Sequence, residues 1–240
     1  MSFTERHALV VGGTSGIGLA TATLLASQGA RVTVAGRDEQ RLRAADALEG
    51  ISARHLDASS PEQVRAFLAE AGQDGIDYLV LALSGGSGAG PLATVDLNDL
   101  REAFEAKFWL HLSVLQAALP YMAKDGSATL ITASSARAAL PGTAGLAAVN
   151  GALEAVIAPL AVELAPLRVN AVSPGVIDTP WWHAFPAEQR QEMFDAYGAA
   201  LPVGRVGRAE EVAQAVVLAA TNGFMTGTVV EVNGGLTLAG

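Results

Sequence analysis

Short apolar runs alternate with longer helix-like segments along almost the whole chain, and this order most constrains the fold. Residues 7–11, 31–35 and 77–83 have the composition of buried strands, and a segment with helical periodicity follows each of them. Connections of this kind make strands parallel and place helices on both faces of the sheet. The sequence therefore predicts one α/β domain, residues 1–240, with a doubly wound parallel sheet.

Two longer segments complete the pattern. Residues 97–122 are expected to contain one long helix. The stretch of about 176–207 lacks clear periodicity and is expected to be irregular. Chain leaving the carboxyl ends of parallel strands surrounds the ligand crevice, so we expect this stretch to form a lid. Its large side chains are Trp181, Trp182, His183, Phe185, Met193, Phe194 and Tyr197.

Composition argues against several classes of function. The chain has 15 basic and 24 acidic residues and a net charge of −9, so no nucleic-acid partner is expected. It has no cysteine, and its four histidines are too far apart for a zinc-type pair, so no metal site is predicted. The uncharged stretch 79–95 is broken by glycine and serine, and the N-terminus lacks a targeting pattern. We therefore expect a cytoplasmic protein with no membrane partner.

A glycine-rich turn stands between the first expected strand and the first expected helix. In a dinucleotide site, one glycine allows a tight turn, one admits a pyrophosphate, and one lets the helix pack closely on the strand. The helix N-terminus adds free N–H groups and a positive dipole end. The residues predicted to hold a dinucleotide here are Gly12, Thr14, Ser15, Gly16, Ile17 and Gly18.

The end of the second strand discriminates between the two nicotinamide cofactors. An acidic residue there would bind a ribose 2′-hydroxyl and repel a 2′-phosphate. The chain instead has Gly36 followed by Arg37, whose planar guanidinium suits a phosphate. The alternatives are a solvated Arg37 paired with Asp38, or an Asp38 that turns toward the ribose. The pattern favours NADP(H) over NAD(H).

The Gly-x-x-x-Gly-x-Gly spacing resembles that of the short-chain dehydrogenases/reductases, and the resemblance extends over almost the whole chain. It recurs in Leu56-Asp57, in residues 168–179 and in Asn233-Gly234-Gly235. It implies a Rossmann-type fold, a small-molecule substrate, and a homodimer or homotetramer. It also implies that Asp57 binds the adenine amino group, although a turn cap is the alternative for this residue. Val176, Ile177 and Thr179 are implied to hold the nicotinamide carboxamide, and Pro174 and Gly175 are implied to belong to the cofactor site.

The catalytic pattern of that family is altered in this chain. The family uses a Tyr-x-x-x-Lys pair on one helix and an asparagine on an earlier helix. The resemblance places Leu146 at the tyrosine position, Asn150 at the lysine position, and Lys107 at the asparagine position. We hypothesise that Lys107 and Asn150 lie at the nicotinamide ribose, and that a buried Lys107 with a lowered pKa acts as the acid. The alternative is a lysine that pairs with Glu105 or Glu163, or points outward.

Two further residues are candidates near the reacting centre. Ser134 is predicted to donate its hydroxyl to the substrate, with Ser135 one residue away and a strand-end cap as the alternative role. His111 lies one helical turn after Lys107, and a lone histidine on an apolar helix is expected to be packed rather than catalytic.

The sequence thus predicts an NADP(H)-dependent oxidoreductase with an atypical catalytic site, acting on a small, apolar carbonyl or alcohol. The alternative is a catalytically silent NADP(H)-binding sensor or partner protein on the same fold. Non-redox chemistry is a third possibility, because a fold does not determine a function.

Overall fold

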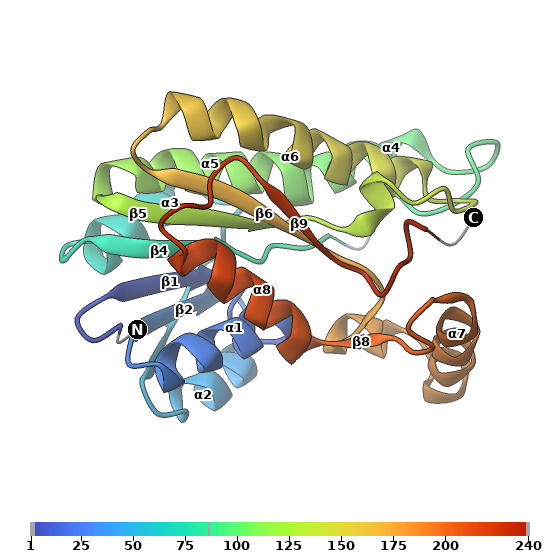
Figure 1. Cartoon of the computed structure of the whole chain (residues 1–240), viewed down its shortest axis with the longest axis horizontal. Coiled ribbons are helices and arrows are strands. Elements are labelled where there is room, and N and C mark those ends of the chain that lie inside the picture. The colour runs from blue at the N-terminus through green and yellow to red at the C-terminus, as the bar shows by residue number, and fades with distance from the viewer. Residues whose placement is uncertain (1–2, 86, 239–240) are drawn as a thin grey trace.

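The computed structural model describes residues 3–85 and 87–238, so the two residues at each end of the expected domain and residue 86 lie outside the description. A seven-stranded parallel sheet crosses the molecule in the order β3-β2-β1-β4-β5-β6-β9 (Figure 1). The strands are β1 (His7–Val11), β2 (Arg31–Gly36), β3 (Ile51–His55), β4 (Ile76–Leu81), β5 (Met122–Ile131), β6 (Arg168–Pro174) and β9 (Val229–Val232). The order reverses between β1 and β4, and a ligand crevice is expected at such a point. The predicted doubly wound parallel sheet is confirmed.

Helices cover both faces of this sheet, as Figure 1 shows. On one face lie α1 (Gly16–Ser27), α2 (Glu39–Asp46) and α8 (Ala209–Thr221). On the other lie α3 (Pro61–Ala71), α5 (Leu110–Ala118) and α6 (Ala144–Glu163). The helices of each face also touch one another, with contacts of α1 with α8 and of α3 with α5. The sheet is therefore shielded from water on both sides, which explains why its central strands β1 and β4 are largely apolar.

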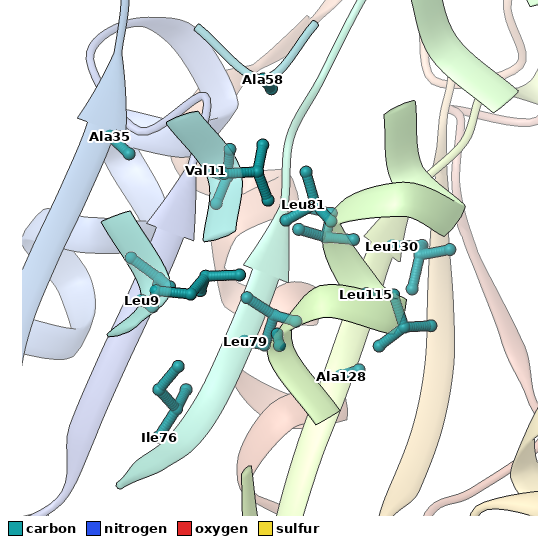
Figure 2. Packing of buried hydrophobic residues seen from close by; sticks show 14 of the residues in the cluster. Leu9, Val11, Ala35, Ala58, Ile76, Leu79, Leu81, Leu115, Ala128 and Leu130 are labelled. Atoms are coloured by element: carbon teal, nitrogen blue, oxygen red, sulfur yellow. The ribbon is translucent and has the colours of Figure 1, made fainter. Parts of the chain in front are cut away.

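Successive side chains of β1 enter two different cores. Leu9 and Val11 pack with Leu79, Leu81 and other residues on the α5 side, as Figure 2 shows. Ala8 and Val10 face the opposite way, into the core shared with α1 and α8. A fully buried leucine or valine contributes roughly 1.5–3 kcal/mol through the hydrophobic effect. The two cores hold the carboxyl ends of the strands in fixed register, and these ends position the site.

The prediction of one long helix in 97–122 is wrong, because the helical segment is interrupted. The segment consists of α4 (Leu97–Ala103), a π-helical turn Phe104–Trp109, α5, and a 3-10 turn Leu119–Tyr121 that contains Pro120. β5 begins directly afterwards at Met122. A π-turn shifts the side chains that follow it by part of a turn and often marks a functional position. This turn carries Lys107.

The stretch 176–207 is not irregular, which corrects a second prediction. It contains β7 (Ile177–Asp178), a 3-10 turn Pro180–Ala184, helix α7 (Ala187–Ala200) and β8 (Gly207–Arg208). Strands β7 and β8 pair in parallel and close the base of the segment. Trp182 lies at its centre, in ring contact with Trp181, Phe185, Phe194 and Tyr197. In Figure 1 α7 stands beside the sheet rather than on either face.

Candidate active site

Two adjoining cavities follow the carboxyl ends of the strands. The inner cavity, of about 340 Å³, extends from the glycine turn to Lys107 and the aromatic residues of 176–207. The outer cavity, of about 510 Å³, is lined by Arg37, Asp57 and their neighbours. Five residues line both cavities, namely Gly12, Ser15, Ala82, Leu83 and Ser84. Together the cavities form one continuous groove along the edge where the strand order reverses.

Glycines are required in the turn between β1 and α1. Gly12 has a φ of +83°, and a Cβ there would lie 2.4 Å from the Ala82 carbonyl oxygen. A Cβ on Gly18 would lie 2.2 Å from the Gly12 oxygen, so any side chain would force the helix off the strand. The hydroxyl of Ser15, the N-cap of α1, accepts no hydrogen bond from the backbone N–H groups of the first helical turn. The amides of this turn are therefore left for an anion in the groove.

The outer cavity contains two guanidinium groups. Arg37 and Arg41 both line it, and Arg41 also donates to Ser15 Oγ at 3.5 Å. Asp38 Oδ1 accepts from the Arg41 backbone N–H at 2.8 Å, so this carboxylate caps α2. Gly36 has no room for a side chain, because a Cβ there would lie 2.8 Å from Thr14 Oγ1. Sequence reasoning missed Arg41, although a second arginine four residues after Arg37, in the first turn of the expected helix, was a usable signal.

Asp57 lines the outer cavity and also caps a turn. Its Oδ1 accepts from the backbone N–H of Ser59 at 3.0 Å and from the Ser59 hydroxyl at 2.7 Å. These two hydrogen bonds lower the pKa of the Asp57 carboxyl below its usual value. The structure therefore supports the turn-cap alternative, and leaves the adenine contact as a proposal.

Lys107 and Asn150 line the same inner cavity, together with Leu146. The π-turn of Lys107 packs against α6, which carries the other two residues. Lys107 Nζ donates to the Thr132 carbonyl oxygen at 3.3 Å, and the amine has no ion pair among the described residues. The expected alternatives, a pair with Glu105 or Glu163, are thus absent from the described part of the chain. Desolvation lowers the pKa of the Lys107 amine to about 8.

Asn150 has one buried polar atom that finds no partner among the described residues. Its Nδ2 donates to the Leu146 carbonyl oxygen at 2.9 Å and to Ser135 Oγ at 3.1 Å. Its Oδ1 is buried and accepts no hydrogen bond within residues 3–85 and 87–238. Buried acceptors in native proteins are nearly always satisfied, so this oxygen needs a donor that the described residues do not supply.

The two candidate serines, Ser134 and Ser135, lie in different surroundings. Ser134 is buried, and its Oγ donates to the Ser173 carbonyl oxygen at 3.1 Å, which ties the ends of β5 and β6 together. Ser135 instead lines the inner cavity, where its Oγ accepts from Asn150. A 3-10 turn over Ser134–Ala136 follows β5 and directs the two hydroxyls differently. The expected alternative for Ser134, a strand-end tie, is what the structure has.

His111 bridges α5 and the end of β4. Its Nδ1 lies 2.7 Å from the Lys107 carbonyl oxygen and its Nε2 lies 3.2 Å from that of Leu81. Burial, together with the charge of Lys107, lowers the pKa of His111 to about 4. A neutral imidazole has one N–H, so it donates to only one of the two oxygens. The ring is fully buried and does not line the inner cavity.

Glu154 joins the strands behind the cavity, and sequence reasoning missed it. Its carboxylate accepts from the hydroxyls of Thr132 at 3.0 Å and Ser173 at 2.8 Å, and pairs with Arg137 Nε at 2.9 Å. Arg137 also pairs with Glu231 of β9. An acidic residue one turn after Asn150, in the middle of a mostly apolar helix, was the available signal. This cluster fixes the ends of β5, β6 and β9 beside the groove.

Comparisons with known proteins agree with this geometry. A family model described as enoyl-(acyl carrier protein) reductase matches residues 11–237. A short-chain dehydrogenase/reductase of Malbranchea aurantiaca is 30% identical, with 97% of this chain and 95% of the relative covered. The cis-4-hydroxycyclohexanecarboxylate dehydrogenase of Sinomonas cyclohexanicum is 32% identical, with 98% of each covered.

Solved structures similar to this chain are also dehydrogenases and reductases. A small-chain dehydrogenase in complex with NADPH has a TM-score of 0.83 at 32% identity, with 97% of this chain and 99% of that chain covered. The MalC reductase/Diels-Alderase of Malbranchea aurantiaca has a TM-score of 0.89 at 28% identity, with 98% of each chain covered. On this likeness of sequence and fold over nearly its whole length, the chain belongs to the short-chain dehydrogenase/reductase family of oxidoreductases.

Proposed function

We propose that the protein is an NADP(H)-dependent oxidoreductase that interconverts a small, largely apolar carbonyl compound and its alcohol, with Lys107 as the proton donor. The observation that carries the proposal is the inner cavity. There a desolvated amine and the unpartnered Asn150 Oδ1 share one apolar space with the glycine turn. The apolar part of the cavity comes from Leu146 and the aromatic residues of 176–207, which we propose act as its lid.

The groove fits NADP(H) along its whole length. The glycine turn, with Thr14, Ser15 and Ile17, would hold the pyrophosphate at the N-terminus of α1. Arg37 and Arg41 would hold the 2′-phosphate, and Asp57 would lie at the adenine. The relative solved with NADPH supports this choice of cofactor. The residues that would surround the nicotinamide are Asn150, Pro174, Gly175, Ile177 and Thr179.

The reaction needs a hydride, which NADPH supplies when bound, and a proton at the carbonyl oxygen. The Lys107 ammonium has donors to spare beyond its bond to Thr132 and would deliver the proton to that oxygen. The Ser135 hydroxyl would donate to the same oxygen, and Asn150 Oδ1 is free to accept from a ribose hydroxyl. The segment 176–207 would exclude water from the site.

A catalytically silent NADP(H)-binding protein is the second candidate, and Leu146 favours it because leucine stands where the family uses a proton-donating tyrosine. The deciding experiment is a fluorescence titration with NADPH, followed by NADPH oxidation over a panel of ketones, aldehydes and quinones. Micromolar binding with turnover supports the enzyme. Tight binding without turnover on any member supports the silent protein, and no binding of either nicotinamide cofactor contradicts both.

Removal of the outer-cavity guanidiniums is expected to change cofactor preference. Charge-assisted hydrogen bonds to phosphate contribute roughly 1.5–3 kcal/mol, so Arg37→Ala should raise the Kd for NADPH by about 10- to 100-fold. The Kd for NADH, which lacks the 2′-phosphate, should change by less than about threefold. Arg41→Ala should act in the same direction, and Arg43→Ala on the exposed face of α2 serves as the control. An equal loss for both cofactors would contradict the assignment of Arg37.

We also propose that α5 and α6 form the interface with a second copy of the chain in a homo-oligomer. By length and composition α6 could cross a membrane, with a mean hydropathy of 1.7 over its most apolar window, only 33% of which is buried. Its inner face, with Leu153 and Ile157, packs on the sheet, which marks it as a core helix. On the side of α6 that faces away from the sheet, Val162 is 81% exposed, and Trp109 on the neighbouring π-turn is 50% exposed. Such exposed apolar surface indicates a protein interface.

Light scattering at micromolar concentration is expected to show a dimer or tetramer. The double variant Trp109→Glu and Val162→Glu should be a folded monomer, because buried unpaired carboxylates would oppose association. A monomeric wild-type protein would contradict the proposal.

A further inference from the structure

We propose that the substrate is an oxo acid whose carboxylate lies one or two carbons from its carbonyl, with the Lys107 ammonium bound to both groups. This inference rests on the proposed function and names the chemical class that its inner cavity would select. It starts from an imbalance of charge in that cavity. The described residues that line it include one charged side chain, Lys107, and no carboxylate.

The charged groups around Lys107 are already engaged elsewhere. From α6, the charge of Glu154 partly offsets the lowering of the Lys107 pKa, but this carboxylate forms no ion pair with the amine, is satisfied by two hydroxyls and by Arg137, and does not line the inner cavity. From α5, His111 is neutral near pH 7 because its pKa is lowered to about 4. On the π-turn itself, Glu105 lines the outer cavity. A cation thus faces an apolar space with no ion partner among the described residues, and such a cation favours an anionic ligand.

The hydrogen-bonding capacity of the amine sets the spacing of the two substrate groups. An ammonium has three donors, and the Thr132 carbonyl oxygen takes one of them at 3.3 Å. Two donors remain, and they leave the same nitrogen. One can bind a carboxylate oxygen while the other binds and protonates the carbonyl oxygen, provided that the two oxygens are close together. A 2-oxo or 3-oxo acid meets this condition, and a ketone without the acid uses only one donor.

The rest of the cavity fits the remainder of such a molecule. Leu140, Leu146, Trp182 and Tyr197 line the space beyond Lys107 and would surround an apolar body. The reduction is balanced: hydride from NADPH goes to the carbonyl carbon, a proton from Lys107 goes to the oxygen, and the carboxylate is unchanged. The amine then recovers its proton from solvent.

Binding can be measured without turnover in a dead-end complex. The enzyme saturated with NADPH cannot reduce 3-phenyllactate, an alcohol that carries the carboxylate, and its methyl ester is a neutral match. We expect the acid to bind about 10- to 100-fold more tightly than the ester at pH 7, because a charge-assisted hydrogen bond has that effect. The affinity for the acid should fall as the pH rises above about 8, while that for the ester should not. Phenylpyruvate and its methyl ester should show the same preference in kcat/KM.

Variants of the two lysines complete the experiment. Lys107→Met should remove the preference for the acid and leave the Kd for NADPH within about twofold. Lys124→Met, at the exposed second lysine of the chain, should keep the preference.

Equal binding of acid and ester by the wild-type enzyme would overturn the inference. A large loss of NADPH binding in Lys107→Met would also overturn it, because the amine would then neutralise a cofactor phosphate. If NADPH does not bind to the wild-type protein, the proposed function itself fails; turnover of neutral ketones without an acid preference refutes only the oxo-acid class.

Discussion

Lys107→Met is expected to lower kcat for carbonyl reduction by about 100-fold or more while it stabilises the folded protein. A positioned general acid contributes about 10²- to 10⁴-fold to a rate. Leu146 stands where the family has its proton-donating tyrosine, so that position cannot supply the proton in place of Lys107. Methionine keeps the length and most of the volume of the side chain, so the cavity should retain its shape. Steady-state NADPH oxidation measures the loss.

The gain in stability follows from the same buried charge. The pKa of Lys107 is lowered to about 8, below its ordinary value of 10.5. At pH 7 the amine is protonated in both states, and the folded state bears the charge in a less favourable environment. The full shift corresponds to about 3 kcal/mol, and we expect about 2 kcal/mol because the amine faces an open cavity. This penalty is complete below pH 8 and vanishes as the pH rises through 10.5.

Urea unfolding at pH 7 measures this second effect, with Lys124→Met as the exposed control. The control should change neither the rate nor the free energy of unfolding by a measurable amount. A Lys107→Met protein that is both active and less stable than wild type would show that the amine has a structural role only.

Gly18→Ala is expected to abolish cofactor binding and to destabilise the fold. The new methyl group would lie 2.2 Å from the Gly12 carbonyl oxygen and 3.1 Å from the Gly13 Cα. Both are backbone atoms, so α1 must move away from β1. Overpacking of this kind costs about 1–3 kcal/mol, and the moved amides no longer meet the phosphates. We expect the Kd for NADPH to rise by more than about 100-fold, or about 3 kcal/mol.

Gly223→Ala provides the control for that substitution. A Cβ at this exposed position would meet no atom within 4 Å, and its φ needs no glycine. Thermal unfolding and NADPH titration should therefore leave it close to wild type. If Gly18→Ala bound NADPH normally, the packing of α1 on the turn would not be what holds the cofactor site.

The sheet was predictable because its strands are buried on both faces. Runs such as 78–83 are apolar at every position, and the helices between them show that they are parallel. The glycine turn was predictable for the same reason that it resists substitution. A Cβ on Gly12 or on Gly18 would lie 2.4 Å or 2.2 Å from a backbone carbonyl oxygen. Constraints of this kind are local, so they leave a clear mark on the sequence.

The features that were missed depend on contacts between distant parts of the chain. The π-turn at Phe104–Trp109 has no sequence signal of its own, yet it sets where the Lys107 amine points. Helix α7 has few large apolar residues, and its Phe194 and Tyr197 pack on the ring of Trp182. The choice between Ser134 and Ser135 depends on one 3-10 turn after β5. One residue decides whether the hydroxyl is buried between the ends of β5 and β6, as in Ser134, or lines the cavity, as in Ser135.

The pH dependence of kcat/KM for a neutral ketone, at saturating NADPH, tests the role of Lys107 most directly. This ratio reports ionisations of the enzyme–NADPH complex before the ketone binds. If the Lys107 ammonium is the acid, kcat/KM is constant at low pH and falls tenfold per unit above a pKa near 8, and Lys107→Met lacks this limb. A wild-type profile that stays flat through that region, or a variant that keeps the same limb, would contradict the assignment of Lys107 as the proton donor.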